Sequence, residues 1–411
     1  MKDAELIPHL FRTEYRKIVS VLCYLFGIEH IETAEDIVSE TFLVASETWS
    51  VKGIPEKPAA WLYTVAKNKT RNFLKRNAIF EQKLIEQARL GHGGDYEEIN
   101  VDLSEKNIND SQLAMMFTVC VPSISKESQI SLALNLLCGF GVQEIADGFL
   151  TGKDTIYKRI KRAKEKLKSD GIKIEPPRIS EINQRLETVL TAIYLLFSEG
   201  YYSVSNDITL RKDVCAEAMR LNHLLIENKN TDVPASNALL SLMYFHASRF
   251  DARTDELGSA ILYEDQDENR WNRQLITQGI YYLNRASKGE KLTKYHLEAG
   301  IAYWHTHKKD TSEKWENILE LYNKLIILEY SPIVAMNRTF AVAKVMGKEK
   351  AITEAEKLRL VDNHLYFSLL GNLYTDIDNN KALAYFQTAK SLATTTADKT
   401  MIAQSIRKIN I

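Results

Sequence analysis

The most constraining feature of the sequence lies in residues 126–168, where two short apolar helical stretches precede a strongly basic one. Glycines at both ends of residues 139–141 interrupt the first stretch and predict a turn. A short amphipathic helix is predicted next, because apolar residues recur at i, i+3, i+4 and i+7. These apolar residues are Val142, Ile145, Ala146 and Phe149. Gly152 predicts a second turn, so this part of the chain has the pattern of a helix-turn-helix.

The basic helix that follows has one apolar stripe, formed by Ile156, Ile160, Ala163 and Leu167. Its other positions carry an excess of cations: Lys153, Lys158, Arg159, Lys161, Arg162, Lys164, Lys166 and Lys168. An apolar stripe for docking and a cationic remainder are what a recognition helix in a DNA major groove needs. The alternative is a solvated surface helix, but such helices usually balance Lys with Glu at i+4. That balance is absent here, so the pattern favours DNA binding.

The composition indicates an all-α protein of two to four domains. The chain has 411 residues, 45% apolar, and alternating β-branched runs are scarce. Its net charge is −1, so nucleic acid would be bound through local basic patches. We expect a cytoplasmic protein without a membrane partner, since no signal-peptide core or bilayer-length apolar run occurs. The four scattered cysteines form no C-x-x-C pair and favour reduced thiols over zinc or disulfides.

Residues 1–80 form the first predicted module, with helices at 6–26, from about 33, and at 59–76. A loop with two prolines and a glycine separates the last two helices. The second half of the third helix is cationic and has no acid: Lys67, Lys69, Arg71, Lys75 and Arg76. Because Trp61 and Tyr63 precede these cations, the helix suits single-stranded DNA, whose bases stack on aromatic rings. For Trp61 itself, burial in the core is the simpler interpretation.

Together the two basic helices lead to a specific resemblance. Residues 36–45 and 61–76 resemble region 2 of sigma-70-type sigma factors of the extracytoplasmic-function group, and residues 143–146 and 155–164 look like their region 4. The resemblance implies a promoter-specific initiation factor for core RNA polymerase. Region 2, a helical bundle, would bind the β′ clamp and the single-stranded −10 element. Region 4 would bind the −35 duplex and the β flap.

The resemblance also implies roles for individual residues. Asp36 and Glu40 would lie on the clamp-binding helix, and residues 51–60 would form the loop that captures a flipped −10 base. Promoter DNA at the −10 element would face Lys67, Arg71, Asn72, Lys75 and Arg76. The −35 groove would meet Lys153, Thr155, Tyr157, Lys158, Arg159, Lys161 and Arg162. Tyr157 stands where relatives often have a small or basic residue, so base preference does not transfer. The resemblance implies no catalytic residue, metal or cofactor.

An acidic linker is predicted at residues 81–112, between region 2 and a region 4 module at residues 113–173. Its acids outnumber its bases, and glycines cluster at residues 91–94. The simpler interpretation is a solvated, disordered linker. The alternative is an acidic strand that follows a basic polymerase channel in place of nucleic acid. The apolar residues 113–122 are expected to pack on the region 4 helices.

Residues 180–411 are predicted to form successive helix pairs, as in an α-solenoid. One stretch has tetratricopeptide spacing with one turn residue missing: Phe367, Leu370, Gly371, Tyr374, Ala382, Phe386 and Ala389. This part resembles the C-terminal extension of a sigma-factor subgroup with tetratricopeptide-like (TPR-like) domains, through residues 195–201, 262–271 and 331–338. The resemblance implies a regulatory domain that replaces a separate anti-sigma factor and responds to an unidentified regulator.

Two further alternatives concern the C-terminal part. The acids Glu264, Asp265, Asp267 and Glu268 could bind a hard cation, but their spacing lacks the glycine and distal Glu of a calcium loop. Capping and loop hydrogen bonds are the favoured interpretation. For the whole chain, the second hypothesis is a helix-turn-helix activator with a solenoid sensor domain. No motif supports an enzyme.

Overall fold

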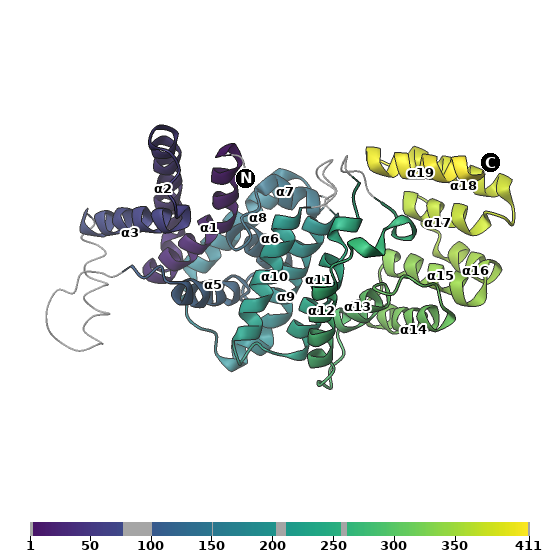
Figure 1. Ribbon diagram of the computed structural model, residues 1–411. Helices are drawn as coiled ribbons and strands as arrows, with labels where there is room; N and C mark the ends of the chain where they lie inside the picture. The colour runs from purple at the N-terminus through teal and green to yellow at the C-terminus, as the bar shows by residue number, and fades with distance from the viewer. Residues whose placement is uncertain (1–2, 77–100, 150, 203–210, 256–260, 410–411) are drawn as a thin grey trace. The chain divides into compact units, whose positions relative to one another are not determined.

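The computed structural model describes residues 3–76, 101–149, 151–202, 211–255 and 261–409. These residues form an all-α fold with no β-strand among them, as the composition predicts (Figure 1). The chain divides into two compact units, residues 1–193 and 194–411. The division falls within one helix, α9 (Ile179–Tyr202), rather than at residues 173–180, where the sequence-based boundary was placed. Each unit is described on its own below.

Three helices begin unit 1: α1 (Asp3–Phe26), α2 (Ile31–Lys52) and α3 (Pro58–Arg76). A short 3-10 turn, η1 (Ile28–His30), joins the first two. The buried face of α1 contains Ile18, Leu22 and Cys23, which are fully removed from solvent. The buried face of α2 contains Ala34, Ile37, Val38, Thr41, Phe42, Ala45 and Trp49. Apolar spacing alone predicts this face, because one helical stripe must be removed from water.

Four more helices follow in unit 1: α5 (Glu105–Val119), α6 (Lys126–Leu136), α7 (Val142–Gly148) and α8 (Lys153–Ser169). Helix α5 packs against α1 and begins within residues 81–112, which the sequence assigns to an acidic linker. The side chain of Ser104 caps α5, and Ile108 and Gln112 are buried in it. The acids of α5 face solvent, so a charge count alone misses the helix. Residues 81–100 of the predicted linker lie outside the described residues.

The predicted turn between α6 and α7 is built by glycine and one buried ring. Gly139 has φ +73°, a left-handed conformation that residues with a Cβ rarely adopt. Phe140 is 4% exposed, and its carbonyl accepts a hydrogen bond from Asn135 Nδ2 at 2.9 Å. The Glu144 carboxylate accepts from the Gly141 N–H at 2.8 Å and so caps α7. These contacts fix the turn between α6 and α7, and the assignment of α6–α8 as a DNA-binding helix-turn-helix stays a prediction.

Unit 2 continues from the second half of α9 through ten further α-helices among its described residues. They are α10 (Lys212–Glu227), α11 (Pro234–Ala247), α12 (Arg273–Ala286), α13 (Lys294–Trp304), α14 (Ser312–Leu328), α15 (Pro332–Met346), α16 (Lys348–Leu358), α17 (His364–Tyr374), α18 (Asn379–Leu392) and α19 (Thr396–Ile409). From α10 to α19, helices that follow each other among the described residues pack together, and α13 packs more extensively on α11 than on α12. This neighbour-to-neighbour packing is the arrangement of an α-solenoid (Figure 1, green to yellow).

The sequence repeat at 367–389 corresponds to the packed pair α17 and α18. Gly371 allows their closest approach, because a Cβ there would lie 2.8 Å from the ring of Phe386. Phe386 and Ala389 are 1% and 0% exposed. The helix pair is therefore confirmed as a packing unit, and its assignment as a tetratricopeptide stays a prediction.

The acidic stretch before α12 forms two short 3-10 turns, η3 (Tyr263–Asp265) and η4 (Glu268–Arg270). All four of its acids are exposed. The side chain of Asp267 caps η4 by accepting from the Asn269 N–H at 2.9 Å. Hydrogen bonding within the turn therefore accounts for Asp267, the role that the sequence analysis favoured over a metal ligand.

Candidate nucleic-acid interface

Helix α8 presents a divided surface. Its buried stripe is Ile156, Ile160, Ala163 and Leu167, the four residues predicted from spacing, and it packs on α6 and α7. The predicted DNA-facing side chains lie mostly in the first half of the helix. Exposed among them are Lys153, Thr155, Tyr157, Lys158, Lys161 and Arg162, while Arg159 is half-buried. Tyr157 is 58% exposed, a large ring held in water.

The cations of this first half have no acidic partner. Among the described residues, no carboxylate lies within 4.0 Å of Lys153, Lys158, Arg159, Lys161 or Arg162. Cations that are not neutralised by the protein itself attract phosphates and release counterions on binding. The first two to three turns of α8 are therefore a surface suited to a nucleic-acid backbone.

The second half of α8 is engaged with the protein itself. Lys164 Nζ lies 3.0 Å from the Glu35 carboxylate, which also pairs with Arg16 at 3.0 Å. Lys168 pairs with Glu32, and Lys166 pairs with Asp170 at 2.7 Å. Glu32 and Glu35 belong to the start of α2, about 130 residues earlier in the chain. The pairs of Glu32 and Glu35 therefore join α8 to the first module of unit 1.

Where α8 meets the start of α2, the neighbouring lysines favour the ionised form of the Glu32 carboxyl group over its protonated form. Partial burial works to raise the pKa of Glu32, but the hydrogen bond from Lys168 and the charge of Lys164 nearby hold it below its ordinary value. The Lys164 and Glu35 side chains are only 16% and 22% exposed. Sequence reasoning missed this contact, because no local pattern links residues so far apart.

The second predicted surface lies on α3. Its buried face contains Leu62, Ala66, Thr70 and Leu74 at every fourth position. On the other faces, Asn72, Lys75 and Arg76 are exposed, whereas Lys67 and Arg71 are half-buried. All five predicted residues are therefore at least partly accessible to solvent on α3. The three exposed ones lie in the last turn and a half of the helix.

The two aromatic residues at the start of α3 serve the packing of unit 1. Trp61 is half-buried and meets the buried Trp49 edge to face, with ring centroids 5.3 Å apart. The Tyr63 hydroxyl donates a hydrogen bond to the Glu14 carboxylate at 2.5 Å. Trp61 therefore contributes to the core, as the simpler interpretation holds, while part of its ring stays accessible.

The outer face of α2 carries the two residues predicted to bind polymerase. Asp36 and Glu40 are both exposed and lie one turn apart. Leu43 continues the same face at 59% exposure, an unusually open position for leucine. Glu40 pairs with Lys69 of α3 at 2.8 Å but remains 64% exposed, so it stays available to another protein.

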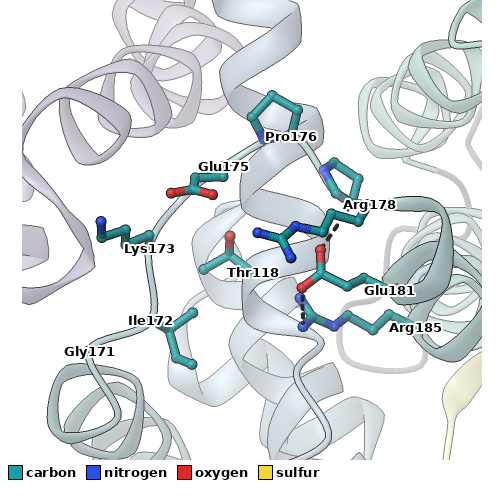
Figure 2. A pocket seen from close by; sticks show the side chains of 10 residues that line it. Thr118, Gly171, Ile172, Lys173, Glu175, Pro176, Arg178, Glu181 and Arg185 are labelled. Atoms are coloured by element: carbon teal, nitrogen blue, oxygen red, sulfur yellow. Dashed lines mark hydrogen bonds and ion pairs between the residues drawn. The ribbon is translucent and has the colours of Figure 1, made fainter. Parts of the chain in front are cut away.

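A pocket of about 380 Å³ lies where α8 is followed by α9 (Figure 2). Figure 2 shows Glu181 beside Arg178 and Arg185, and the Glu181 carboxylate pairs with Arg185 at 3.1 Å. Arg185 also donates to the Phe117 carbonyl at 3.1 Å and so fastens α9 to the end of α5. Two acids, Glu175 and Glu181, face three cations in the pocket lining, and the contacts of Arg185 indicate that this region joins α5 to α9.

Comparison with known proteins gives a match to the first three helices of unit 1. Residues 10–79, which contain most of α1 together with α2 and α3, match the model of sigma-70 region 2. The chain is also 32% identical over 382 residues to the uncharacterized protein R00370 of Rhizobium meliloti (strain 1021), across 92% of this chain and 90% of that protein. The chain belongs to the same family as that protein.

The sigma-70 region 2 match supports membership of the sigma-70 family and a role in transcription with RNA polymerase and promoter DNA. Residues 185–287 match a second model, a family of unknown function, which covers α10 to α12 and most of α9. No solved structure matches the chain. None of the described helices is both long and apolar enough to cross a membrane.

Proposed function

We propose that this protein is an RNA polymerase sigma factor that directs promoter-specific transcription initiation. The observation that carries the proposal is the sigma-70 region 2 match over residues 10–79, followed in the same compact unit by the helix-turn-helix α6–α8. A simple DNA-binding activator would need the helix-turn-helix but would leave α1–α3 without a role. The polymerase, not this chain, would perform the chemistry.

The proposal assigns a partner to each exposed surface of unit 1. The outer face of α2, with Asp36 and Glu40, would bind the β′ clamp of core polymerase. Asn72, Lys75 and Arg76 at the end of α3 would bind the −10 single strand, where cations follow the backbone. The exposed first half of α8 would enter the −35 major groove as region 4, with the β flap bound by the same module. Such a factor works in the cytoplasm.

Promoter binding requires the two regions of unit 1 to separate. The −10 and −35 elements are centred about 25 base pairs apart, which is roughly 85 Å of duplex at about 3.4 Å per pair. In the compact unit, Lys164 of α8 lies 3.0 Å from Glu35 of α2. One rigid body of this form cannot hold both elements, so the ion pairs of Glu32 and Glu35 stabilise a form that precedes engagement. We assign the regulation of this step to unit 2, as a TPR-like domain.

The test is promoter binding by the complex of the full chain with core polymerase. The double change Arg159→Ala and Arg162→Ala should weaken binding by about 1–3 kcal/mol per base contact, or lower the salt dependence by about one ion per phosphate contact. Lys166→Ala is the matched control, because Lys166 already pairs with Asp170. Equal affinity of the double variant and the control would refute the role of α8.

A further inference from the structure

A cluster of charged and aromatic side chains in unit 2 is centred on the ring of Tyr263. The guanidinium of Arg249 and the ammonium of Lys314 lie 5.3 and 5.1 Å from the centroid of this ring. His305 meets the ring edge to face at 5.2 Å. The Tyr263 hydroxyl accepts from Lys314 Nζ at 3.1 Å and donates to the His305 carbonyl at 3.1 Å. The ring of Tyr263 is thus in contact with residues from three other segments of unit 2 that are distant from one another in sequence.

The two cations of this Tyr263 cluster lack a counterion. Within the part of the chain that the structure describes, no carboxylate lies within 4.0 Å of Arg249 or Lys314. The nearby Asp310 instead pairs with Lys344 at 2.8 Å. Lys314 is only 1% exposed, and burial lowers the pKa of its ammonium group. The Lys314 ammonium donates to the Tyr263 hydroxyl at 3.1 Å and to the His307 carbonyl at 2.8 Å, but both partners are neutral. The site therefore carries a surplus of positive charge that a bound anion would neutralise.

Around these cations lie nitrogen atoms for which the described part of the chain supplies no hydrogen-bond partner. They are His246 Nδ1, His305 Nδ1 and Trp271 Nε1, and Trp271 is 3% exposed. Burial, and then the charge of Arg249, lowers the pKa of both histidines, to about 3 for His305. Both rings are therefore neutral at physiological pH, and each can present one N–H. Neutral rings beside uncompensated cations suit an anion and disfavour a metal ion.

We infer that the Tyr263 cluster of unit 2 binds a phosphate-bearing small molecule. Arg249 and Lys314 supply two positive charges, which match the charge of −1.5 to −2 that a phosphate ester carries near pH 7 better than a single carboxylate. The planar guanidinium of Arg249 donates in parallel to two phosphate oxygens, and Lys314 adds a point charge. Arg249 and His305 are half-buried and so remain partly accessible to a ligand from solvent, whereas Lys314 is 1% exposed.

One buried acceptor also belongs to the turn of Tyr263, since the Gln266 N–H donates to the Tyr263 carbonyl at 3.3 Å. Gln266 Oε1 is buried without a hydrogen-bond partner, and the residue is 4% exposed. A hydroxyl group on the ligand would satisfy it, which favours a phosphorylated polyol or sugar over inorganic phosphate. This inference rests on unit 2 alone and does not depend on the role proposed for unit 1.

The experiment measures thermal unfolding and calorimetric binding of the full chain with inorganic phosphate and with ribose 5-phosphate, against sodium chloride at equal ionic strength. We expect a saturable rise in the unfolding temperature with phosphate but not with chloride. Tighter binding of ribose 5-phosphate would assign the site to an ester, and tighter binding of inorganic phosphate would assign it to the free ion; both support the inference. No phosphate-specific stabilisation would overturn it.

Two variants test the location of the site. Lys314→Met should bind phosphate at least about tenfold more weakly while its unliganded form keeps its stability, because removing a buried charge that no carboxylate neutralises offsets the loss of its hydrogen bonds to Tyr263 and His307. Lys324→Met is the matched control on the same helix, where the side chain is 53% exposed and pairs with Glu320. Arg249→Gln provides a second test if Lys314→Met fails to fold. Unchanged phosphate affinity in both cluster variants would show that these cations serve packing only.

Discussion

The ion pairs between α8 and the start of α2 can be removed without touching any predicted DNA-facing residue. We consider the double change Glu32→Gln and Glu35→Gln. In the compact unit, Glu35 accepts from Lys164 and Arg16, both at 3.0 Å, and Glu32 accepts from Lys168. Glutamine keeps the size of each side chain and removes its charge, so the change acts on electrostatics with little effect on packing.

The size of the effect follows from the exposure of each pair. The Arg16–Glu35 pair joins α1 to α2 and persists when α8 moves away, so it does not affect the separation. The Lys164–Glu35 pair is 16% and 22% exposed and should contribute about 1 kcal/mol, near the upper end for surface pairs. The Lys168–Glu32 pair, 32% and 56% exposed, should contribute about 0.5 kcal/mol. Their sum of about 1.5 kcal/mol shifts the equilibrium toward separation roughly tenfold.

Energy transfer between two dyes on unit 1 measures this shift. Ser46 of α2 and Glu165 of α8, which are both exposed and belong to no predicted interface, can be changed to cysteine for labelling. The half-buried Cys138 is replaced by serine. The other thiols are buried, and burial raises the pKa of Cys23, Cys120 and Cys215, so they react poorly with the dyes.

We expect the double variant to lose energy transfer at about tenfold lower core polymerase concentration than the parent chain. Glu105→Gln is the control, because Glu105 is exposed on α5 and forms no ion pair with a described residue. Identical titrations for the parent, the double variant and the control would refute the reasoning that these pairs hold the compact form.

Two further predictions concern the stability of unit 2. Burial raises the pKa of Glu298 from 4.5 to about 7, so the folded state keeps a proton that the unfolded chain releases. Stability should therefore fall as pH rises between these values, by up to about 3 kcal/mol, and Glu298→Gln should remove that dependence in urea unfolding at about pH 5 and about pH 8. Gly371→Ala should lower the free energy of unfolding by about 1–3 kcal/mol, because its Cβ would lie 2.8 Å from Phe386. The exposed Gln387→Ala is its control, and an equal effect of both changes would contradict the packing argument.

Periodicity predicted the helices and their buried faces well. The stripe of α8 and the helix pair at residues 364–392 could be derived from spacing, because burial of one helical face is a local property of the sequence. The start of α5 could not. Its acids suggested a linker, whereas the buried Ile108 and the Ser104 cap hold it as a helix against α1.

The functional surfaces were predicted only in part. Every predicted DNA-facing residue of α8 lies within residues 153–162, and the structure leaves all of them exposed apart from Arg159. The engagement of Lys164 and Lys168 with α2 was not predictable, because it depends on tertiary packing across about 130 residues. The Tyr263 cluster was missed for the same reason. Its members come from separate loops and helices, and the sequence signals around residues 262–271 were a group of acids and a family resemblance, neither of which indicates a cluster of cations.

The most direct test of the sigma-factor account is transcription in vitro with core RNA polymerase and genomic DNA, with the 5′ ends of the products mapped. The account predicts discrete new 5′ ends that appear only when the full chain is added and that the double change Arg159→Ala and Arg162→Ala abolishes. A chain that neither binds core polymerase nor produces any new 5′ end would contradict it.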